Sequence, residues 1–383
     1  MKDVGTISIG IRMPIIKEGD DLGETVVNGV LNATFVETNY VSVAASETKS
    51  GWEVEKRKQY DLEDRDVIGI TESVVARSIG KYVTLDEIGR WLVERYGEKK
   101  DYILVDPIYS RNRFSMILKA IARVAGTVRI IMPEYDEVGN PRGVNPFTGV
   151  DIGKYYNEIV VQEGARCECC TYVVYELPVS KDGCVVIYCG LHDYKSHKAM
   201  YGDVCENYLT LADICSDRCE YGLLGSNKAT EEKLKLFPDK GDCEGLLSYV
   251  QTEIMNRTGK KVEVMVYGDG CFKDPVGGIW EFADPVVSPA YTSGLEGTPN
   301  EIKIKAFADD KFKDLSGNKL NDAIKCEIRN KGKNLVGNMA SQGTTPRRYT
   351  DLLGSLMDLT SGSGDKGCPV VLVKNYFKNY ADE

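Results

Sequence analysis

The feature that most constrains the fold is a regular alternation of strand and helix patterns after residue 100. Apolar runs typical of buried strands cover Tyr102 to Val105 and Val128 to Met132, and a helical pattern lies between them. A second strand–helix pair covers Cys184 to Cys189 and the Tyr208 to Ile214 region. Because strands that alternate with helices at this spacing form parallel sheets, we expect a small inserted α/β domain over residues 101–219.

Sequence on either side of this segment predicts a second unit. At 383 residues the chain is long for one domain. Thr84-Leu85-Asp86-Glu87 is a capping box that opens a helix, and the last helix is expected to start with Thr345 as cap and Pro346 in its first position. Strand patterns occur at residues 6–11, 66–71, 262–267 and 369–374. The predicted fold is therefore a mixed α/β (α+β) core, discontinuous over 1–100 and 220–383, that carries the inserted domain.

Composition narrows the function classes. The net charge of −10 and the lack of basic blocks argue against nucleic acid as the main partner. No apolar run is long enough to cross a bilayer, and the amino terminus lacks the apolar core of a signal peptide, so we expect a cytoplasmic protein without a membrane partner. The 12 cysteines and two histidines, His192 and His197, lack paired C-x2-C spacing, which favours free thiols over a zinc site.

A glycine-rich stretch, Gly362-Ser363-Gly364-Asp365-Lys366-Gly367, precedes the last strand. It matches G-x-G-x-x-G literally, but a dinucleotide fingerprint follows a strand and opens a helix, whereas this stretch follows a helix. Small residues still let backbone amides approach an anion closely, and Lys366 adds a positive charge. The alternative is an ordinary glycine stop and turn, although the residue content exceeds what a stop requires. No P-loop motif is present.

Other segments offer polar groups at ends of elements. Ser341 to Arg348 leads into the last helix with hydroxyls and two arginines, a candidate anion site or a simple cap with solvated arginines. Arg347 and Asp351 lie one helical turn apart. They are either residues of a functional site or a simple pair on the helix surface. Ser110 to Arg113 follows a strand and opens a helix, so its two arginines at the helix start are a further candidate anion site. Asp269 lies between two glycines directly after a strand. This position favours either a metal-binding carboxylate or an ordinary turn aspartate.

With these positions in hand, the sequence resembles the coenzyme F420-0:L-glutamate ligase (γ-glutamyl ligase) family, as a longer variant with an inserted domain. The matching blocks, in order, are Met13 to Leu22, Asp66 to Arg77, the Ser226-Asn227 turn, Thr258 to Asp269, and Gly362 to Pro369. They span both ends of the chain and skip the inserted segment. The first and last blocks are the more specific ones.

The resemblance implies a homodimeric ligase that uses GTP, or ATP, with Mg²⁺ or Mn²⁺ to add L-glutamate to a small carboxylate acceptor. Asp269 and Asn227 would bind metal, and Asp269, Arg77, Arg347 and Asp351 are the candidate catalytic residues. The nucleotide would contact Met13, Pro14, Ile15, Ile16, Glu72, Ser73, Arg77, Asn227, Gly362, Ser363, Gly364, Asp365, Lys366 and Gly367.

The sequence departs from the family pattern around the metals. The family's Asp-Thr pair aligns with Gly268-Asp269, so the carboxylate is displaced by one position. A metal-binding aspartate aligns with Leu224, which cannot ligate, and a lysine of the second block is Arg77, which keeps the charge and changes the geometry. Candidates to replace the missing carboxylate are Asp106, Asp217 and Glu220.

Three functions stay open at this point. The leading hypothesis is a nucleotide- and metal-dependent γ-glutamyl ligase acting on an acceptor like coenzyme F420-0, with a role in coenzyme F420 biosynthesis. A folate-type glutamyl ligase is the first alternative, since the inserted domain can reshape the acceptor pocket. The second is a nucleotide- or metabolite-binding protein that keeps the fold without catalysis, which Leu224 at a ligand position favours.

Overall fold

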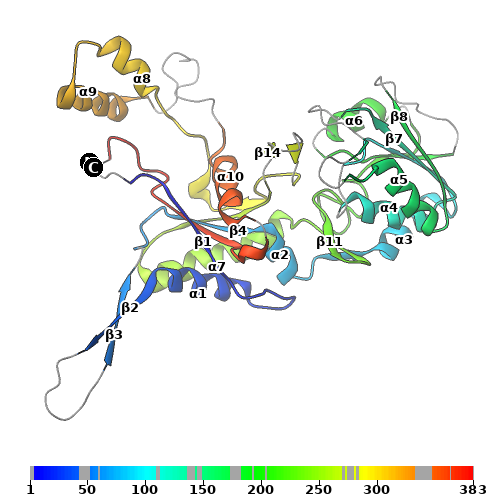
Figure 1. The fold of residues 1–383 in the computed structure, drawn as a ribbon, viewed down its shortest axis with the longest axis horizontal. Helices are drawn as coiled ribbons and strands as arrows, with labels where there is room; N and C mark the ends of the chain where they lie inside the picture. The colour runs from blue at the N-terminus through cyan, green and yellow to red at the C-terminus, as the bar shows by residue number, and fades with distance from the viewer. Residues whose placement is uncertain are drawn as a thin grey trace.

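The chain forms two lobes joined side by side, with both termini at the far end of the first lobe (Figure 1). The structure is a computed structural model, and it describes residues 4–42, 52–58, 61–108, 113–135, 143–144, 149–172, 183–191, 194–202, 205–269, 272–273, 280–281, 284–332, 347–362 and 364–382. Within these ranges no helix is long and apolar enough to cross a membrane.

The first lobe is built on a five-stranded mixed sheet. Its strand order is β1 (Ile7–Ile11), β17 (Val370–Lys374), β4 (Val67–Thr71), β13 (Glu263–Tyr267) and β16 (Ala290–Tyr291). Neighbours β4 and β13 are parallel, and the other pairs are antiparallel. All five residues of β13 and of β17 are buried, which explains their nearly continuous apolar sequences.

Helices cover both faces of this sheet. On one face α1 (Leu22–Ala33) and α7 (Lys240–Thr258) share a core with β4, β13 and β17. On the other face α10 (Tyr349–Ser361) packs Leu353 and Met357 against the strands. The Asp21 side chain caps α1 by accepting from the Glu24 amide at 2.9 Å.

The start of α10 corrects one expectation. The helix begins at Tyr349 rather than at Pro346, and the Tyr349 amide donates to the Gly297 carbonyl at 3.1 Å. Residue 348 provides no side-chain cap. The segment Ser341 to Pro346, with its expected Thr345 cap, lies outside the described residues.

The second lobe contains a five-stranded sheet in which every pair is parallel. The strand order is β10 (Tyr208–Thr210), β9 (Val185–Tyr188), β6 (Asp101–Val105), β7 (Thr127–Pro133) and β8 (Arg166–Tyr172). Around it lie α3 (Leu85–Tyr96), α4 (Phe114–Val124), α5 (Ile152–Gln162) and α6 (Tyr194–Tyr201). The mixed α/β fold with a parallel sheet in this segment is confirmed.

The exact limits of the inserted domain stay a prediction. The hydrophobic core around the parallel sheet also takes in Leu85, Ile88 and Leu92 from before residue 101. From after residue 219 it takes in Leu224 and Leu234. Core packing therefore extends beyond the predicted segment on both sides.

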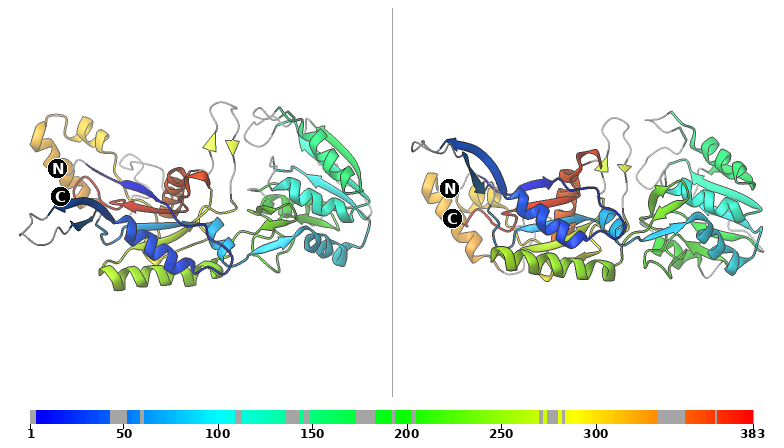
Figure 2. Two further views of the ribbon diagram at one scale, coloured as in Figure 1. Left: turned by 60° about the horizontal axis from the view of Figure 1, so that its bottom comes forward. Right: turned by 90° about the horizontal axis from the view of Figure 1, so that it is seen from below.

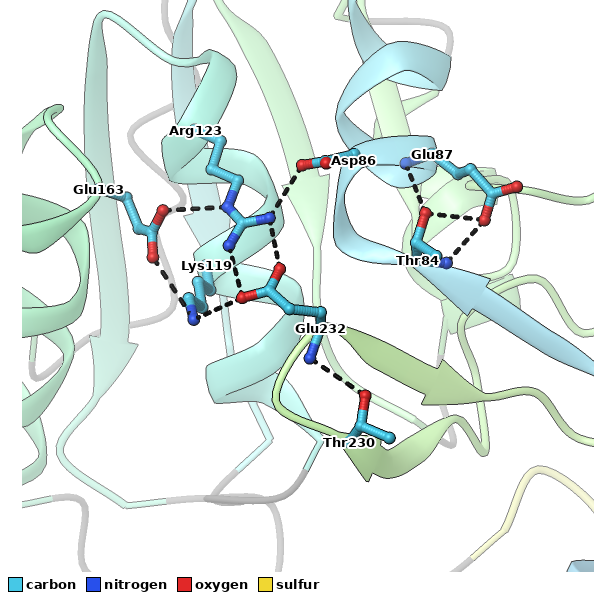
Figure 3. A network of polar contacts seen from close by, with 8 residues as sticks. All are labelled: Thr84, Asp86, Glu87, Lys119, Arg123, Glu163, Thr230 and Glu232. Carbon is cyan, nitrogen blue, oxygen red and sulfur yellow. Dashed lines mark hydrogen bonds and ion pairs between the residues drawn. The ribbon is translucent and has the colours of Figure 1, made fainter.

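A polar network ties helices of the second lobe to a three-stranded sheet of β11 (Asn227–Thr230), β12 (Lys233–Lys235) and β5 (Tyr82–Thr84). Arg123 of α4 bonds to Asp86 of α3, to Glu163 after α5 and to Glu232 in the β11–β12 turn (Figure 3). The capping box expected at the start of α3 is confirmed, because Thr84 and Glu87 make both reciprocal bonds.

Further α-helices and strands complete the two lobes. They are the β2 (Phe35–Ser42) and β3 (Trp52–Lys58) hairpin, α2 (Glu72–Ser78), β14 (Phe272–Lys273), β15 (Trp280–Glu281), α8 (Ile304–Ala306) and α9 (Gly317–Asn330). The β2–β3 hairpin projects away from the first lobe, and the short β14 and β15 strands stand on the side that faces the second lobe (Figure 2).

Candidate active site

The site begins where two parallel strands end. β4 and β13 pair in register, with Thr71 opposite Tyr267. Helix α2 therefore starts with Glu72 beside the point where β13 runs into Gly268-Asp269. The carboxyl ends of adjacent parallel strands meet at one edge of a sheet, which is the usual place for ligand-binding residues in α/β proteins.

Two loops from opposite ends of the chain complete this edge. The Met13 amide donates to the Gly367 carbonyl at 3.0 Å, and the Thr71 amide donates to the Pro369 carbonyl at 2.9 Å. These bonds hold the loop after β1 and the glycine-rich loop before β17 against the end of β4. Segments more than 290 residues apart in sequence are thus brought together, as the matching blocks predicted.

A cavity of about 370 Å³ lies between these segments. Its lining residues are Met13, Pro14, Ile15, Ile16, Thr71, Ser73, Val74, Arg77, Tyr267, Asp269, Asp358, Ser361, Gly362, Gly364, Gly367, Cys368 and Pro369. The volume lies in the range of small-molecule sites, about 300–1,000 Å³. A larger, more open groove of about 590 Å³ lies between β1 and α1, and Asp269, Arg77 and the glycine loop are not among its lining residues.

The glycine loop has the backbone shape that its composition allows. Gly362 and Gly367 have φ angles of 61° and 67°, in the left-handed region that favours glycine. A side chain at 362 would also meet Lys366, because a Cβ placed there would lie 2.6 Å from Nζ. The lysine ammonium is therefore folded back over the start of the loop. Arg77 is a lining residue of the cavity, whereas Asp365 and Lys366 are not among its lining residues. Ser363 lies outside the described residues.

A family model for F420-0:gamma-glutamyl ligase matches residues 10–375 of this chain. The chain belongs to the F420-0:gamma-glutamyl ligase family. A search of curated proteins finds no match to the chain. As a member of this family, the protein is a ligase that acts on small molecules, glutamate among them, and the resemblance seen in the sequence is confirmed over nearly its whole length.

Buried charges lie next to a residue of the cavity wall. Glu72, at the start of α2, pairs with Lys235 of β12, and their side chains are 7% and 9% exposed. Burial raises the pKa of Glu72, and the Lys235 ammonium opposes that rise. Glu72 was expected to contact nucleotide; its neighbour Ser73 lines the cavity, while its own carboxylate is engaged by Lys235.

The sequence interpretation missed Asp284. Its Oδ2 accepts a hydrogen bond from the Asp269 amide at 2.9 Å, and its Oδ1 lies 3.3 Å from Nη2 of Arg113. Burial, and next the negative charge of Glu72, raise the pKa of Asp284 to about 7. The only sequence signal was an Asp-Pro step in a Pro- and Gly-rich segment, which predicts a turn rather than a buried ion pair.

The family positions that depart from the pattern have a structural explanation. Leu224 is fully buried in the second lobe's core, so this position is part of the packing. Of the suggested replacements, Asp217 accepts from the Trp91 indole at 3.0 Å, and Asp106 follows β6 with a φ of 48°. Glu220 and these two are absent from the cavity wall, and Asp284 is the carboxylate found next to Asp269.

Asn227 lies near the site rather than in the cavity wall. It begins β11 and accepts from the Lys228 amide at 2.9 Å. Two residues earlier, Gly225 approaches Pro285 so closely that a Cβ would lie 2.7 Å from the proline ring. The Ser226-Asn227 turn therefore packs beside the segment that carries Asp284, and its role as a metal ligand stays a prediction.

Arg347 and Asp351 are not brought to the cavity. Asp351 pairs with Arg348 at 2.9 Å in the first turn of α10. The cavity is lined by Asp358 and Ser361 from the other end of that helix. Ten residues of α-helix span about 15 Å, so a catalytic role for this pair stays a prediction without support from the cavity geometry.

The residues present fit a nucleotide-bound metal better than a closed metal cage. Among the described residues, no group of three or more His, Cys, Asp or Glu side chains could hold a metal ion. Mg²⁺ commonly takes one or two protein carboxylates and completes its shell with substrate phosphates and water. Asp269, in the wall of a cavity that also contains the glycine loop, suits that arrangement. The ten cysteines whose side chains the structure describes are free thiols.

Proposed function

We propose that this family member is a nucleotide- and divalent-metal-dependent γ-glutamyl ligase that joins L-glutamate to a small carboxylate acceptor. One observation carries the proposal. The Met13–Ile16 loop, the start of α2, Asp269 and the glycine loop, which lie far apart in sequence, line one cavity of about 370 Å³. We assign the nucleotide, GTP or ATP, to that cavity.

The chemistry follows from the poor electrophilicity of a carboxylate. An acceptor carboxylate oxygen attacks the γ-phosphorus, the nucleoside diphosphate leaves, and an acyl phosphate forms. The glutamate amine then attacks the acyl carbon, loses a proton, and expels inorganic phosphate as the amide forms. Catalysis of this kind depends mostly on positioning and on neutralising phosphoryl charge.

Each part of the cavity has a role in this reaction. Backbone amides of the glycine loop approach the phosphates, and the charges of Lys366 and Arg77 neutralise them. Asp269 would hold the metal, Mg²⁺ or Mn²⁺, which would supply positive charge to neutralise the phosphoryl group. Met13 to Ile16 give an apolar wall for the rest of the nucleotide.

We infer that the acceptor resembles coenzyme F420-0, because the family match is to that ligase. A folate-type acceptor is the second candidate, since the second lobe lies beside the site and can contribute to acceptor binding.

We also propose a cytoplasmic homodimer without nucleic acid or membrane partners and without zinc. Light scattering of the purified protein tests the dimer, and metal analysis of chelator-free protein tests zinc.

The test is incubation with GTP or ATP, Mg²⁺ or Mn²⁺, labelled glutamate and each acceptor. The proposal expects acceptor-dependent phosphate release with incorporation of the label. Asp269→Asn should abolish turnover, whereas Asp322→Asn, an exposed aspartate on α9, should leave it unchanged. Nucleotide binding without amide formation on any acceptor would favour a non-catalytic binding protein.

A further inference from the structure

Asp284 bridges the two lobes with its two carboxylate oxygens. One oxygen faces Arg113 of the second lobe at 3.3 Å, and the other accepts from the Asp269 amide at 2.9 Å. The side chains of Asp284 and Arg113 are 1% and 9% exposed, so the contact is shielded from water. A single carboxylate therefore connects the second lobe to the residue assigned to the metal.

The loop around Asp269 is shaped to receive this carboxylate. A Cβ placed on Gly268 would lie 2.6 Å from Oδ2 of Asp284, so only glycine leaves room for it. The Gly268 amide donates to the Val287 carbonyl at 2.9 Å. Both peptide N–H groups before the Asp269 side chain are thus fixed by the segment that follows β15.

Arg113 reaches this loop from a distinctive point of the second sheet. It immediately precedes α4, in the connection that leaves the carboxyl end of β6. In the order β10-β9-β6-β7-β8, β7 and β8 lie on one side of β6, and β9 and β10 lie on the other, so β6 stands at the topological switch point. The carboxyl edge at such a point is where parallel sheets present functional residues.

Stability alone gives no reason for a charged pair here. A buried ion pair has to offset the cost of removing two charges from water, and a well-packed apolar pair of similar volume is often equally stable. An apolar side chain at 284 could not accept a bond from the Asp269 amide. The pair therefore does something at the Asp269 loop that hydrophobic packing cannot do.

We propose that Arg113 and Asp284 form a positioning pair that sets the orientation of Asp269 toward the nucleotide-bound metal, so that the second lobe is a working part of the active site. This inference rests on the proposed function, because it takes Asp269 to be a metal ligand. Arg113 holds the Asp284 carboxylate in place, and that carboxylate holds the backbone of Asp269. Neither residue needs to touch a substrate.

The test compares Asp284→Asn, Arg113→Met and Arg113→Lys with a matched control, Asp66→Asn. Asp66 is equally buried and ion-paired, to Lys374, but it precedes β4 at the opposite end of the strand from the site. Binding of Mn²⁺ in the presence of a non-hydrolysable GTP analogue is measured by electron paramagnetic resonance, alongside kcat, KM and thermal unfolding.

We expect Asp284→Asn and Arg113→Met to raise the Mn²⁺ concentration for half-saturation about tenfold or more and to lower kcat, the size expected for losing a charge-assisted bond. Arg113→Lys should recover part of the loss, and Asp66→Asn should bind Mn²⁺ like the wild type while unfolding at a lower temperature. Unchanged Mn²⁺ binding in Asp284→Asn and Arg113→Met would overturn the inference.

The same titration separates this inference from the proposed function. If the wild type binds Mn²⁺ and nucleotide but forms no amide, ligation fails, and the Mn²⁺ affinities of the variants still decide the positioning role. If the wild type binds no Mn²⁺ with the nucleotide, both proposals fail. An equal loss of Mn²⁺ binding in Asp66→Asn would reduce the pair to a general structural role.

Discussion

Removing the Lys235 side chain would leave the buried Glu72 carboxylate without its ion-pair partner. The Lys235 ammonium contacts both oxygens of Glu72, and the Lys235 and Glu72 side chains are 9% and 7% exposed. Burial already raises the pKa of Glu72 with the lysine present. Lys235→Met should therefore lower the free energy of unfolding by about 3–5 kcal/mol, the usual cost of leaving one partner of a buried pair uncompensated.

Removing both charges should cost much less. In the double variant Lys235→Met/Glu72→Leu no charge stays buried, so we expect a loss several-fold smaller than that of Lys235→Met alone. The matched control is Lys240→Met, which breaks a helix-surface pair with Glu244 in which the side chains are 68% and 62% exposed. Exposed pairs of this kind contribute at most about 0.5 kcal/mol.

Urea unfolding at neutral and at acidic pH measures these differences. The loss caused by Lys235→Met should shrink as the pH falls, because the folded variant gains stability when the isolated Glu72 carboxylate takes up a proton. The reasoning is refuted if Lys235→Met costs no more than Lys240→Met. It is refuted equally if the double variant loses as much as Lys235→Met alone.

Three further predictions concern other parts of the chain. Gly222→Ala should lower the free energy of unfolding by about 2–4 kcal/mol in urea melts, because φ is 54° and a Cβ would lie 2.6 Å from the Leu211 carbonyl oxygen; a near-neutral change would contradict it. Leu224→Asp should lower the free energy of unfolding by about 4 kcal/mol or more in the same assay, because it buries a carboxylate without a partner. It should not tighten Mn²⁺ binding, and tighter binding would show that this position is a metal ligand. Burial raises the pKa of Asp284 from 3.8 to about 7, so the folded state binds its proton more tightly than the unfolded state. The stability of the wild type relative to Asp284→Asn should therefore fall as pH rises from about 4 to about 7, and a rise would refute the sign.

Local patterns predicted most of the elements that form the site. The apolar runs of β13 and β17 and the capping box at Thr84 depend on residues close in sequence, and the structure confirms them. The β2–β3 hairpin was missed, because residues 32–64 are mostly polar and give no clear alternation. The two-residue strand β16 was missed because its pairing with β13 comes from the fold.

The site was predictable only in part, for a physical reason. Segments matched in order as blocks, so Met13 to Ile16 and the glycine loop could be grouped, and they do line one cavity. Arg113 and Asp284 are 171 residues apart, and no local pattern indicates that two such residues meet. Helical spacing placed Arg347 and Asp351 on a common face, but it could not tell which end of α10 reaches the cavity.

The central claim is that this cavity activates an acceptor carboxylate with a nucleotide and then forms an amide with glutamate. The most direct measurement uses coenzyme F420-0 labelled with ¹⁸O in its carboxylate, together with GTP, Mg²⁺ and L-glutamate. The account predicts that one ¹⁸O atom moves into each inorganic phosphate released, because the attacked phosphorus keeps the acceptor oxygen when the amide forms. Released phosphate that carries no ¹⁸O, because its fourth oxygen comes from bulk water, would contradict it.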